Sequence, residues 1–164
     1  MPIERSIVPG PATSIVADDL LLPNGMAFSP GHDRFFQSDS LRKLVWSYPV
    51  RPDGELGPRE LFAQIPEGMA DGVAVAADES VWVAAAYAGA VFRFGVDGRM
   101  LERMDFEPPM VTSVCFSAPG TARKMFVTTG PEEADPDLGG AIFELPVDVA
   151  GVPRNLARVR PATC

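Results

Sequence analysis

Two side chains that carry oxygen donors occupy the same position in two similar stretches of this sequence. Asn24 lies in residues 23–28, PNGMAF, and Asp71 lies in residues 70–75, ADGVAV, 47 positions later. In both stretches the polar residue precedes a glycine and a short apolar run that is typical of a strand. Equivalent positions of successive repeats face one common axis in a propeller or a solenoid. Since carboxylate and amide oxygens suit Ca²⁺, Mg²⁺ or Mn²⁺, the pair indicates a site for a hard metal ion.

The same residues have a second interpretation, which the sequence leaves open. An Asn or Asp before Gly at the start of a strand is often a turn residue whose side chain binds nearby backbone N–H groups. As metal ligands, by contrast, they would support catalysis, because a bound cation polarises a carbonyl group and lowers the pKa of a coordinated water. Thr112 occupies the corresponding position of a third stretch. Its hydroxyl is a weaker ligand, and we expect it to shape the channel.

The repeat that carries these residues occurs three times and consists of short apolar runs. The predicted strands that follow the three starting strands are residues 34–39, 44–48 and 59–63, then 80–84, 90–94 and 100–104, then 124–128 and 141–145. Two Asp-Gly pairs, Asp53-Gly54 and Asp97-Gly98, favour tight hairpin turns, because both central residues can take positive φ. Four strands in roughly 40–45 residues are typical of a β-propeller blade; an ordinary sandwich is the alternative.

We therefore expect an all-β fold, a single partial β-propeller domain over residues 1–164 with about three four-stranded blades. The expected repeats span approximately residues 20–66, 67–108 and 109–152. Propellers usually close with about four to eight blades. Three blades leave two open faces, so we expect either part of a ring or a homodimer that completes one.

Composition excludes several classes of function. The chain has 164 residues, 46% of them hydrophobic, with 17 Pro and 15 Gly for many turns, and its net charge of -8 predicts no binding to nucleic acid. The most apolar stretch, residues 72–94, is interrupted by Asp78 and Glu79 and predicts no membrane span. The start lacks a signal-peptide core. Cys115, in a predicted core strand, and Cys164 make no disulfide framework, so we expect a cytoplasmic location.

Other catalytic systems have little support in the sequence. The one histidine, His32, lies in the loop of residues 29–34 and is expected in a surface turn. There is no Gly-x-Ser-x-Gly motif and no Cys/His cluster with zinc-ligand spacing. The acidic residues 131–137 are expected to form a solvated surface loop, with loose calcium binding as the alternative.

An ordered set of stretches resembles the C-terminal half of a known family, the one that includes regucalcin, gluconolactonase and luciferin-regenerating enzyme. The resemblance runs from about residue 15 to about residue 150. The matching stretches are residues 22–30 (LPNGMAFSP), 38–40 (SDS), 70–75 (ADGVAV), 81–84 (VWVA), 112–116 (TSVCF), 125–129 (MFVTT) and 139–143 (GGAIF).

This resemblance implies a six-bladed propeller with one divalent cation in its central channel. In the family a first-blade glutamate, an Asn and an Asp hold the ion, and the latter two correspond to Asn24 and Asp71. Ca²⁺ is the first expectation, with Mg²⁺, Mn²⁺ or Zn²⁺ as alternatives. The implied activity is metal-dependent hydrolysis of a small-molecule lactone, with Asp71 as both ligand and base. Asp39, also matched, is expected to brace a strand end.

The chain also departs from the family pattern. The first-blade glutamate has no counterpart in this sequence, because the surroundings of Glu4 do not resemble the family's first strand. Two copies would instead present two Asn24 and two Asp71 side chains to a shared channel. The alternative to a lactone hydrolase is a truncated or non-catalytic propeller module that acts in binding only.

Overall fold

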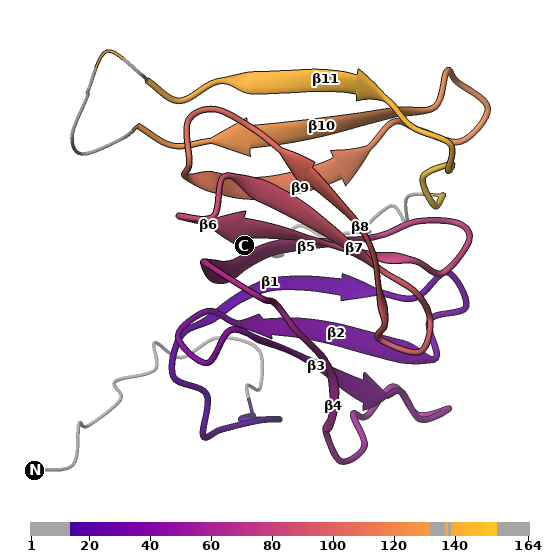
Figure 1. Ribbon diagram of the computed structural model, residues 1–164. Helices are drawn as coiled ribbons and strands as arrows, with labels where there is room; N and C mark the ends of the chain where they lie inside the picture. Colours follow the sequence, from indigo (N-terminus) through magenta and orange to yellow (C-terminus); the bar gives the residue numbers. More distant parts are fainter. Residues whose placement is uncertain (1–13, 132–136, 138, 154–164) are drawn as a thin grey trace, which may run out of the picture.

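The computed structural model in Figure 1 consists of three antiparallel β-sheets and describes residues 14–131, 137 and 139–153. In each sheet consecutive strands pair as neighbours. The first sheet contains β1 (Pro23–Phe28), β2 (Arg34–Asp39), β3 (Leu44–Pro49) and β4 (Glu60–Gln64). The second sheet contains β5 (Met69–Val75), β6 (Val81–Ala86), β7 (Ala90–Phe94) and β8 (Met100–Asp105). The third sheet contains β9 (Val111–Phe116), β10 (Lys124–Thr129) and β11 (Ile142–Pro146).

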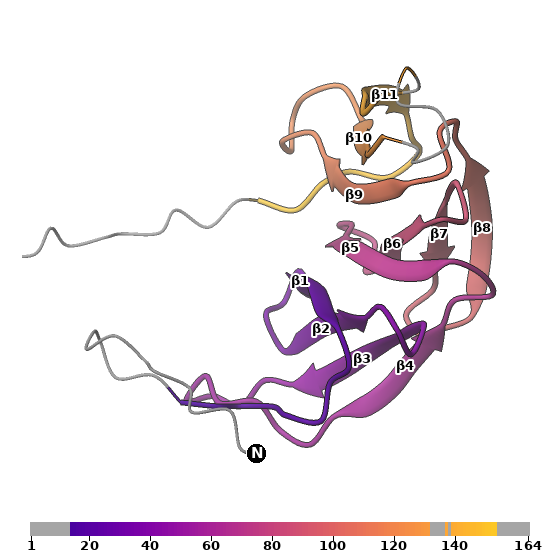
Figure 2. The ribbon, with the colours of Figure 1, turned by 90° about the vertical axis from the view of Figure 1, so that its left-hand side faces the viewer.

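The three sheets fan out as the blades of a propeller arc, which confirms the predicted all-β fold. Figure 2 shows their first strands, β1, β5 and β9, along the concave side, with β4 and β8 on the outside. Along this inner side β1 lies against β5, and β5 lies against β9. The first strands therefore line the concave side of the arc, where the repeat predicts its functional side chains.

The third sheet differs from the expected pattern, because its described part has three strands. After β11 the chain crosses to the second sheet, where Gly151 forms an antiparallel bridge with Ala76. The amide of Ala77 donates a hydrogen bond to the carbonyl of Ala150 at 2.8 Å. The segment after β11 thus connects two blades and does not extend its own sheet.

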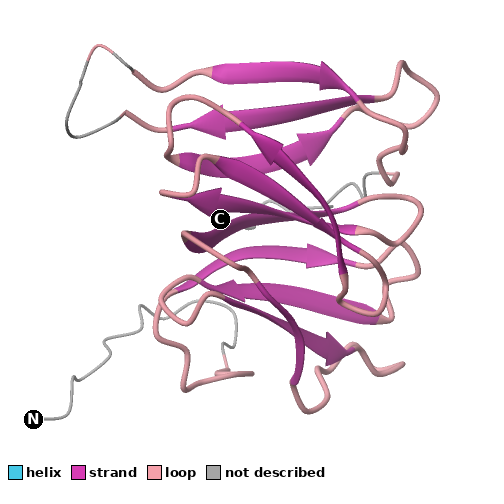
Figure 3. Ribbon diagram, viewed as in Figure 1, coloured by secondary structure: helices cyan, strands magenta, loops and turns pink. Residues whose placement is uncertain are grey.

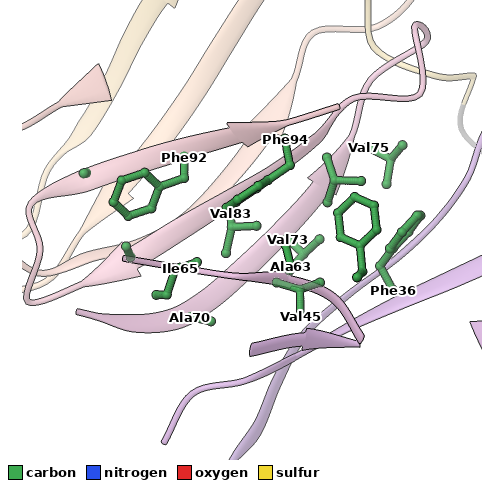
Figure 4. Packing of buried hydrophobic residues seen from close by; sticks show 14 residues of the cluster. Phe36, Val45, Ala63, Ile65, Ala70, Val73, Val75, Val83, Phe92 and Phe94 are labelled. Atoms are coloured by element: carbon green, nitrogen blue, oxygen red, sulfur yellow. The ribbon is translucent and has the colours of Figure 1, made fainter. Parts of the chain in front are cut away.

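Two apolar cores hold the arc together, one on each side of the second sheet. Figure 4 shows the first core, in which Phe36 of the first sheet and Phe92 and Phe94 of the second lie between the blades. Trp82 and Val91 enter the other core, against the third sheet. All of β6 is buried because both of its faces are covered, which explains its uninterrupted apolar sequence. Burial of each large side chain stabilises the fold by about 1.5–3 kcal/mol.

The two Asp-Gly turns form where expected but with another geometry. Among their central residues only Gly54 and Gly98 have positive φ, 87° and 77°. The carboxylates of Asp53 and Asp97 accept hydrogen bonds from the amides two residues further on, at 2.9 and 3.1 Å. The predicted turns are present, but only the glycine of each pair uses the positive φ that both residues can take, and the side-chain bond holds each Asp in an ordinary backbone conformation.

Strands and loops account for all the described residues in Figure 3. Within that part of the chain, no helix is long and apolar enough to span a lipid bilayer.

Candidate functional site

A β-bulge at the same repeat position of each inner strand sets the candidate site residues apart. In the first sheet Pro23 pairs with Asp39 and Met26 with Gln37, so one extra residue lies between the pairs. The second and third sheets have the same register shift. The bulged positions are Asn24 and Gly25, Asp71 and Gly72, and Thr112. A bulge redirects a side chain out of the regular alternation of a strand, which explains how these polar groups reach the inner edge.

The side chains of Asn24 and Asp71 come together across the joint between the first two sheets. Asn24 is exposed and Asp71 is half-buried. Burial raises the pKa of the Asp71 carboxyl group, and the hydrogen bond with the Asn24 side chain opposes this rise without cancelling it. The two residues paired by sequence spacing are therefore in contact in the structure, and the Asp71 carboxyl group is partly shielded from water.

Gly25 allows the joint to close at this point. A Cβ atom added there would lie 2.4 Å from the carbonyl oxygen of Asp71 and 2.5 Å from the amide nitrogen of Val73. A Cβ atom added at Gly72 would likewise meet the third sheet, 2.8 Å from the carbonyl oxygen of Thr112. The glycine after each polar residue is therefore needed for close approach of neighbouring inner strands.

Two buried hydroxyl groups that the sequence analysis did not single out adjoin the pair. Ser38 and Ser40 flank Asp39 in the stretch SDS and are fully buried. Their bonds reach the backbone of β5 beside Asp71. The sequence does contain a signal for these two residues, because Ser38 and Ser40 alternate with Asp39 at the end of an apolar strand.

Asp39 has the bracing position expected for it. It is fully buried and accepts hydrogen bonds from the amides of Leu21 and Leu22, each at 3.2 Å, and from Arg42 at 2.7 Å. Burial alone would raise the pKa of the Asp39 carboxyl group, but the bonds from Arg42, Leu22 and Leu21 outweigh it and hold that pKa below its usual range. Its carboxylate ties the entry of the first sheet to the turn after β2.

The Thr112 hydroxyl makes its hydrogen bonds within its own sheet. Its hydroxyl lies 2.9 Å from the Thr128 hydroxyl and 3.2 Å from the Thr128 carbonyl oxygen. This arrangement leaves Asn24 and Asp71 as the candidate ligands that the structure brings together.

The donor set of this pair suits a hard cation. Asn24 offers an amide carbonyl oxygen and Asp71 a carboxylate, the ligands that Ca²⁺ and Mg²⁺ prefer. Ca²⁺ takes six to eight oxygen ligands, so the pair would supply a minority of them. The described residues contain no cluster of three or more His, Cys, Asp or Glu side chains that could hold a metal.

A cavity of about 670 Å³ lies at the far ends of the same inner strands. Its lining includes Phe28, Val75, Cys115 and Phe116. Cys115 belongs to β9 as predicted, but its side chain is exposed. The expectation of a core cysteine was therefore wrong, because Cys115 lies on the face of β9 opposite buried Val114. The acidic loop falls mainly on residues 132–136, outside the described part of the chain.

Fanned antiparallel sheets whose first strands line the inner side define a β-propeller, here in the form of an arc. Residues 6–131 match the model of the SMP-30/gluconolactonase/LRE-like region, and the chain belongs to this family. The resemblance identified from the sequence is confirmed.

Relatives with known names support this assignment. The chain is 31% identical to pentonolactonase XacC of Haloferax volcanii over 85% of its own length and 52% of that protein. It is 31% identical to a 6-deoxy-6-sulfogluconolactonase of Pseudomonas putida, over 84% of this chain and 50% of that one. The chain spans about half the length of these curated relatives.

Solved structures show the same relationship. The calcium-binding protein regucalcin of Agrobacterium tumefaciens superposes with a TM-score of 0.76 at 27% identity, over 86% of this chain and 51% of that one. A luciferin-regenerating enzyme superposes with a TM-score of 0.71 at 21% identity, over 84% and 50% of the two chains, and shows the shared fold.

Proposed function

We propose that this chain takes part in the hydrolysis of a small lactone, with Asn24 and Asp71 as oxygen ligands of one divalent cation. The observation that carries the proposal is the contact of these two side chains, from adjacent blades, at the inner edge of the arc. Relatives named pentonolactonase, 6-deoxy-6-sulfogluconolactonase and L-arabinolactonase support a lactone of a sugar acid as the substrate. Ca²⁺ is the first candidate, because a calcium-binding regucalcin shares the fold.

The residues of the pair have separate roles in this reaction. When bound, the cation would polarise the lactone carbonyl. Asp71 accepts a proton from the attacking water while the water oxygen bonds to the carbonyl carbon. The ring C–O bond then breaks, and the proton passes from Asp71 to the departing ring oxygen. Asn24 contributes a neutral oxygen and contacts the carboxyl group that moves the proton.

We further propose that a second copy of the chain supplies the remaining blades. Met26 and Phe28 face away from the second sheet and are 66% and 46% exposed. Their repeat equivalents in β5, Val73 and Val75, are buried in the core against the first sheet. Met26 and Phe28 on the open face of the first sheet thus lie at positions that, in the second sheet, are covered by a neighbouring blade.

The open face of the third sheet carries the residues that would contact the first sheet of a second copy. Cys115 and Phe126 pair across β9 and β10 in the way that Ala74 and Trp82 pair across β5 and β6. Ala74 and Trp82 pack into the core between the second and third sheets. Two copies can therefore join third sheet to first sheet twice around a two-fold axis, which closes the ring. We place this assembly in the cytoplasm, consistent with a chain that contains two cysteines.

The test combines solution mass with an assay of hydrolysis. The purified chain is measured by light scattering and by acid release from sugar lactones, with Ca²⁺, Mg²⁺, Mn²⁺ or Zn²⁺ and with chelator. We expect metal-dependent hydrolysis by a dimer, lost in Asp71→Asn and retained in Asp97→Asn, which alters an exposed turn. A stable dimer without hydrolysis would instead favour a binding module. Hydrolysis that survives Asp71→Asn would refute the assigned roles.

A further inference from the structure

We propose that Ser38 and Ser40 are positioning residues that fix the geometry of the Asn24–Asp71 pair. The inference rests on the proposed function of that pair as cation ligands. It assigns two side chains of the first sheet to a site whose carboxyl group belongs to the second sheet.

Both hydroxyl groups hold the backbone of β5 at the candidate ligand. The Ser38 hydroxyl donates a hydrogen bond to the carbonyl oxygen of Asp71 at 2.6 Å. The Ser40 hydroxyl donates to the carbonyl oxygen of the preceding residue, Ala70, also at 2.6 Å. The two serines are 0% and 1% exposed, so water does not compete for these bonds. They therefore fix the bulge from which the Asp71 side chain projects.

Ser40 also makes contact with the second candidate ligand. The amide nitrogen of Asn24 donates to the Ser40 hydroxyl oxygen at 3.4 Å. A carboxamide carries its nitrogen and oxygen on opposite sides of one plane, so holding the nitrogen also fixes the direction of the oxygen. An amide oxygen binds a cation and an amide NH₂ group repels one. A hydrogen bond that lowers the pKa of a carboxyl group is donated to it, so the same NH₂ group also faces Asp71. Ser40 thus holds the plane of the Asn24 carboxamide beside Asp71 and fixes where its oxygen lies.

The adjacent joint shows that blade packing alone does not require these hydroxyl groups. The register of β6 places Ala84 and Ala86 at the positions equivalent to Ser38 and Ser40. Both alanines are buried at the joint with the third sheet, where Thr112 occupies the ligand position. The joint that carries Asp71 has two hydroxyl groups, and the joint without an acidic residue has none at these positions.

The test uses the full chain, with Ca²⁺ alone as the ligand. Calorimetry measures Ca²⁺ affinity, and ¹⁵N NMR follows the side-chain amide of Asn24 in metal-free protein. We expect Ser40→Ala and Ser38→Ala to weaken Ca²⁺ binding roughly 10-fold or more, as other residues that orient metal ligands do. Ser40→Ala should also move the Asn24 amide signal. Ser47→Ala is the matched control, because Ser47 is 3% exposed in β3 and bonds to Arg34.

A second pair of variants separates positioning from folding. Ser40→Thr and Ser40→Val have nearly the same shape, and only threonine keeps the hydroxyl. We expect threonine to retain both the affinity and the amide signal, and valine to lose both. Equal behaviour of the two variants, or an effect of Ser47→Ala as large as that of Ser40→Ala, would overturn the proposal. Wild-type protein that binds no cation would sink the proposed function, while the amide signal would still decide whether Ser40 orients Asn24.

Discussion

Asn24 and Asp71, 47 residues apart in the sequence, contact each other through their side chains across the joint between two blades. The contact depends on two equivalent bulges, one in β1 and one in β5. Each bulge places its polar residue at the inner edge, and the glycine that follows lets the strands approach. The sequence repeat therefore brings two oxygen-bearing side chains, one carboxamide and one carboxyl group, together in the folded protein.

The close approach at Gly25 predicts a large cost for a single methyl group. In Gly25→Ala the new Cβ would meet backbone atoms of Asp71 and Val73, which cannot move aside as a flexible side chain can. We expect a loss of about 2 kcal/mol or more in the free energy of unfolding, the range seen for overpacking. Urea denaturation measures it.

Gly31→Ala is the control for this substitution. A Cβ atom added at Gly31 would lie 3.2 Å from the Asp33 side chain, which can rotate away. Equal losses of stability in Gly25→Ala and Gly31→Ala would contradict this account. They would show that Gly25 is needed for its own backbone conformation and not for the close approach of the two blades.

The buried carboxylate of Asp39 predicts a stability difference that depends on pH. Because the pKa of Asp39 is lowered in the folded protein, its contribution is complete above the ordinary value of about 3.9 and is lost as pH falls through the lower folded value. Asp39→Asn should therefore cost about 2 kcal/mol at pH 7, within the range for hydrogen bonds to a charged group, because it removes the charge that Arg42 and the amides of Leu21 and Leu22 bind. The gap from wild type should shrink below about pH 4.

Unfolding curves of the two proteins at pH 7, 5 and 3.5 check this dependence. Asp97→Asn, at an exposed turn, should follow wild type throughout. A gap that stays constant down to pH 3.5 would show that Asp39 acts through shape and not through charge.

The reactivity of the exposed Cys115 thiol should report whether two copies pair to close the ring. In a Cys164→Ser background, Cys115 should react rapidly with a thiol reagent in dilute protein, because its side chain is accessible. Pairing of two copies would cover the face that carries it, so the rate should fall several-fold as protein concentration rises. Phe126→Asp, a charge beside Cys115 on that face, should keep the thiol reactive at all concentrations. Rates that never change with concentration would contradict the proposed pairing.

Much of the fold followed from sequence because blade repeats carry their signal locally. Apolar runs between turn residues predicted the strands, and equal spacing predicted that Asn24 and Asp71 share one side of the molecule. The exposure of Cys115 could not be foreseen, since a strand sequence does not show which neighbour covers which face. Likewise, the bonds of Ser38 and Ser40 join separate blades, and their partners are backbone carbonyls that every residue possesses.

The most direct measurement of the central claim is a double-mutant cycle on Ca²⁺ affinity, measured by calorimetry for wild type, Asn24→Ala, Asp71→Ala and the double variant. Two ligands of one ion depend on each other, so their effects should not add. We predict that each single substitution weakens binding at least 10-fold and that the double variant binds little worse than Asp71→Ala alone. Binding that is unchanged in either single variant, or losses that add in full, would contradict a cation held jointly by Asn24 and Asp71.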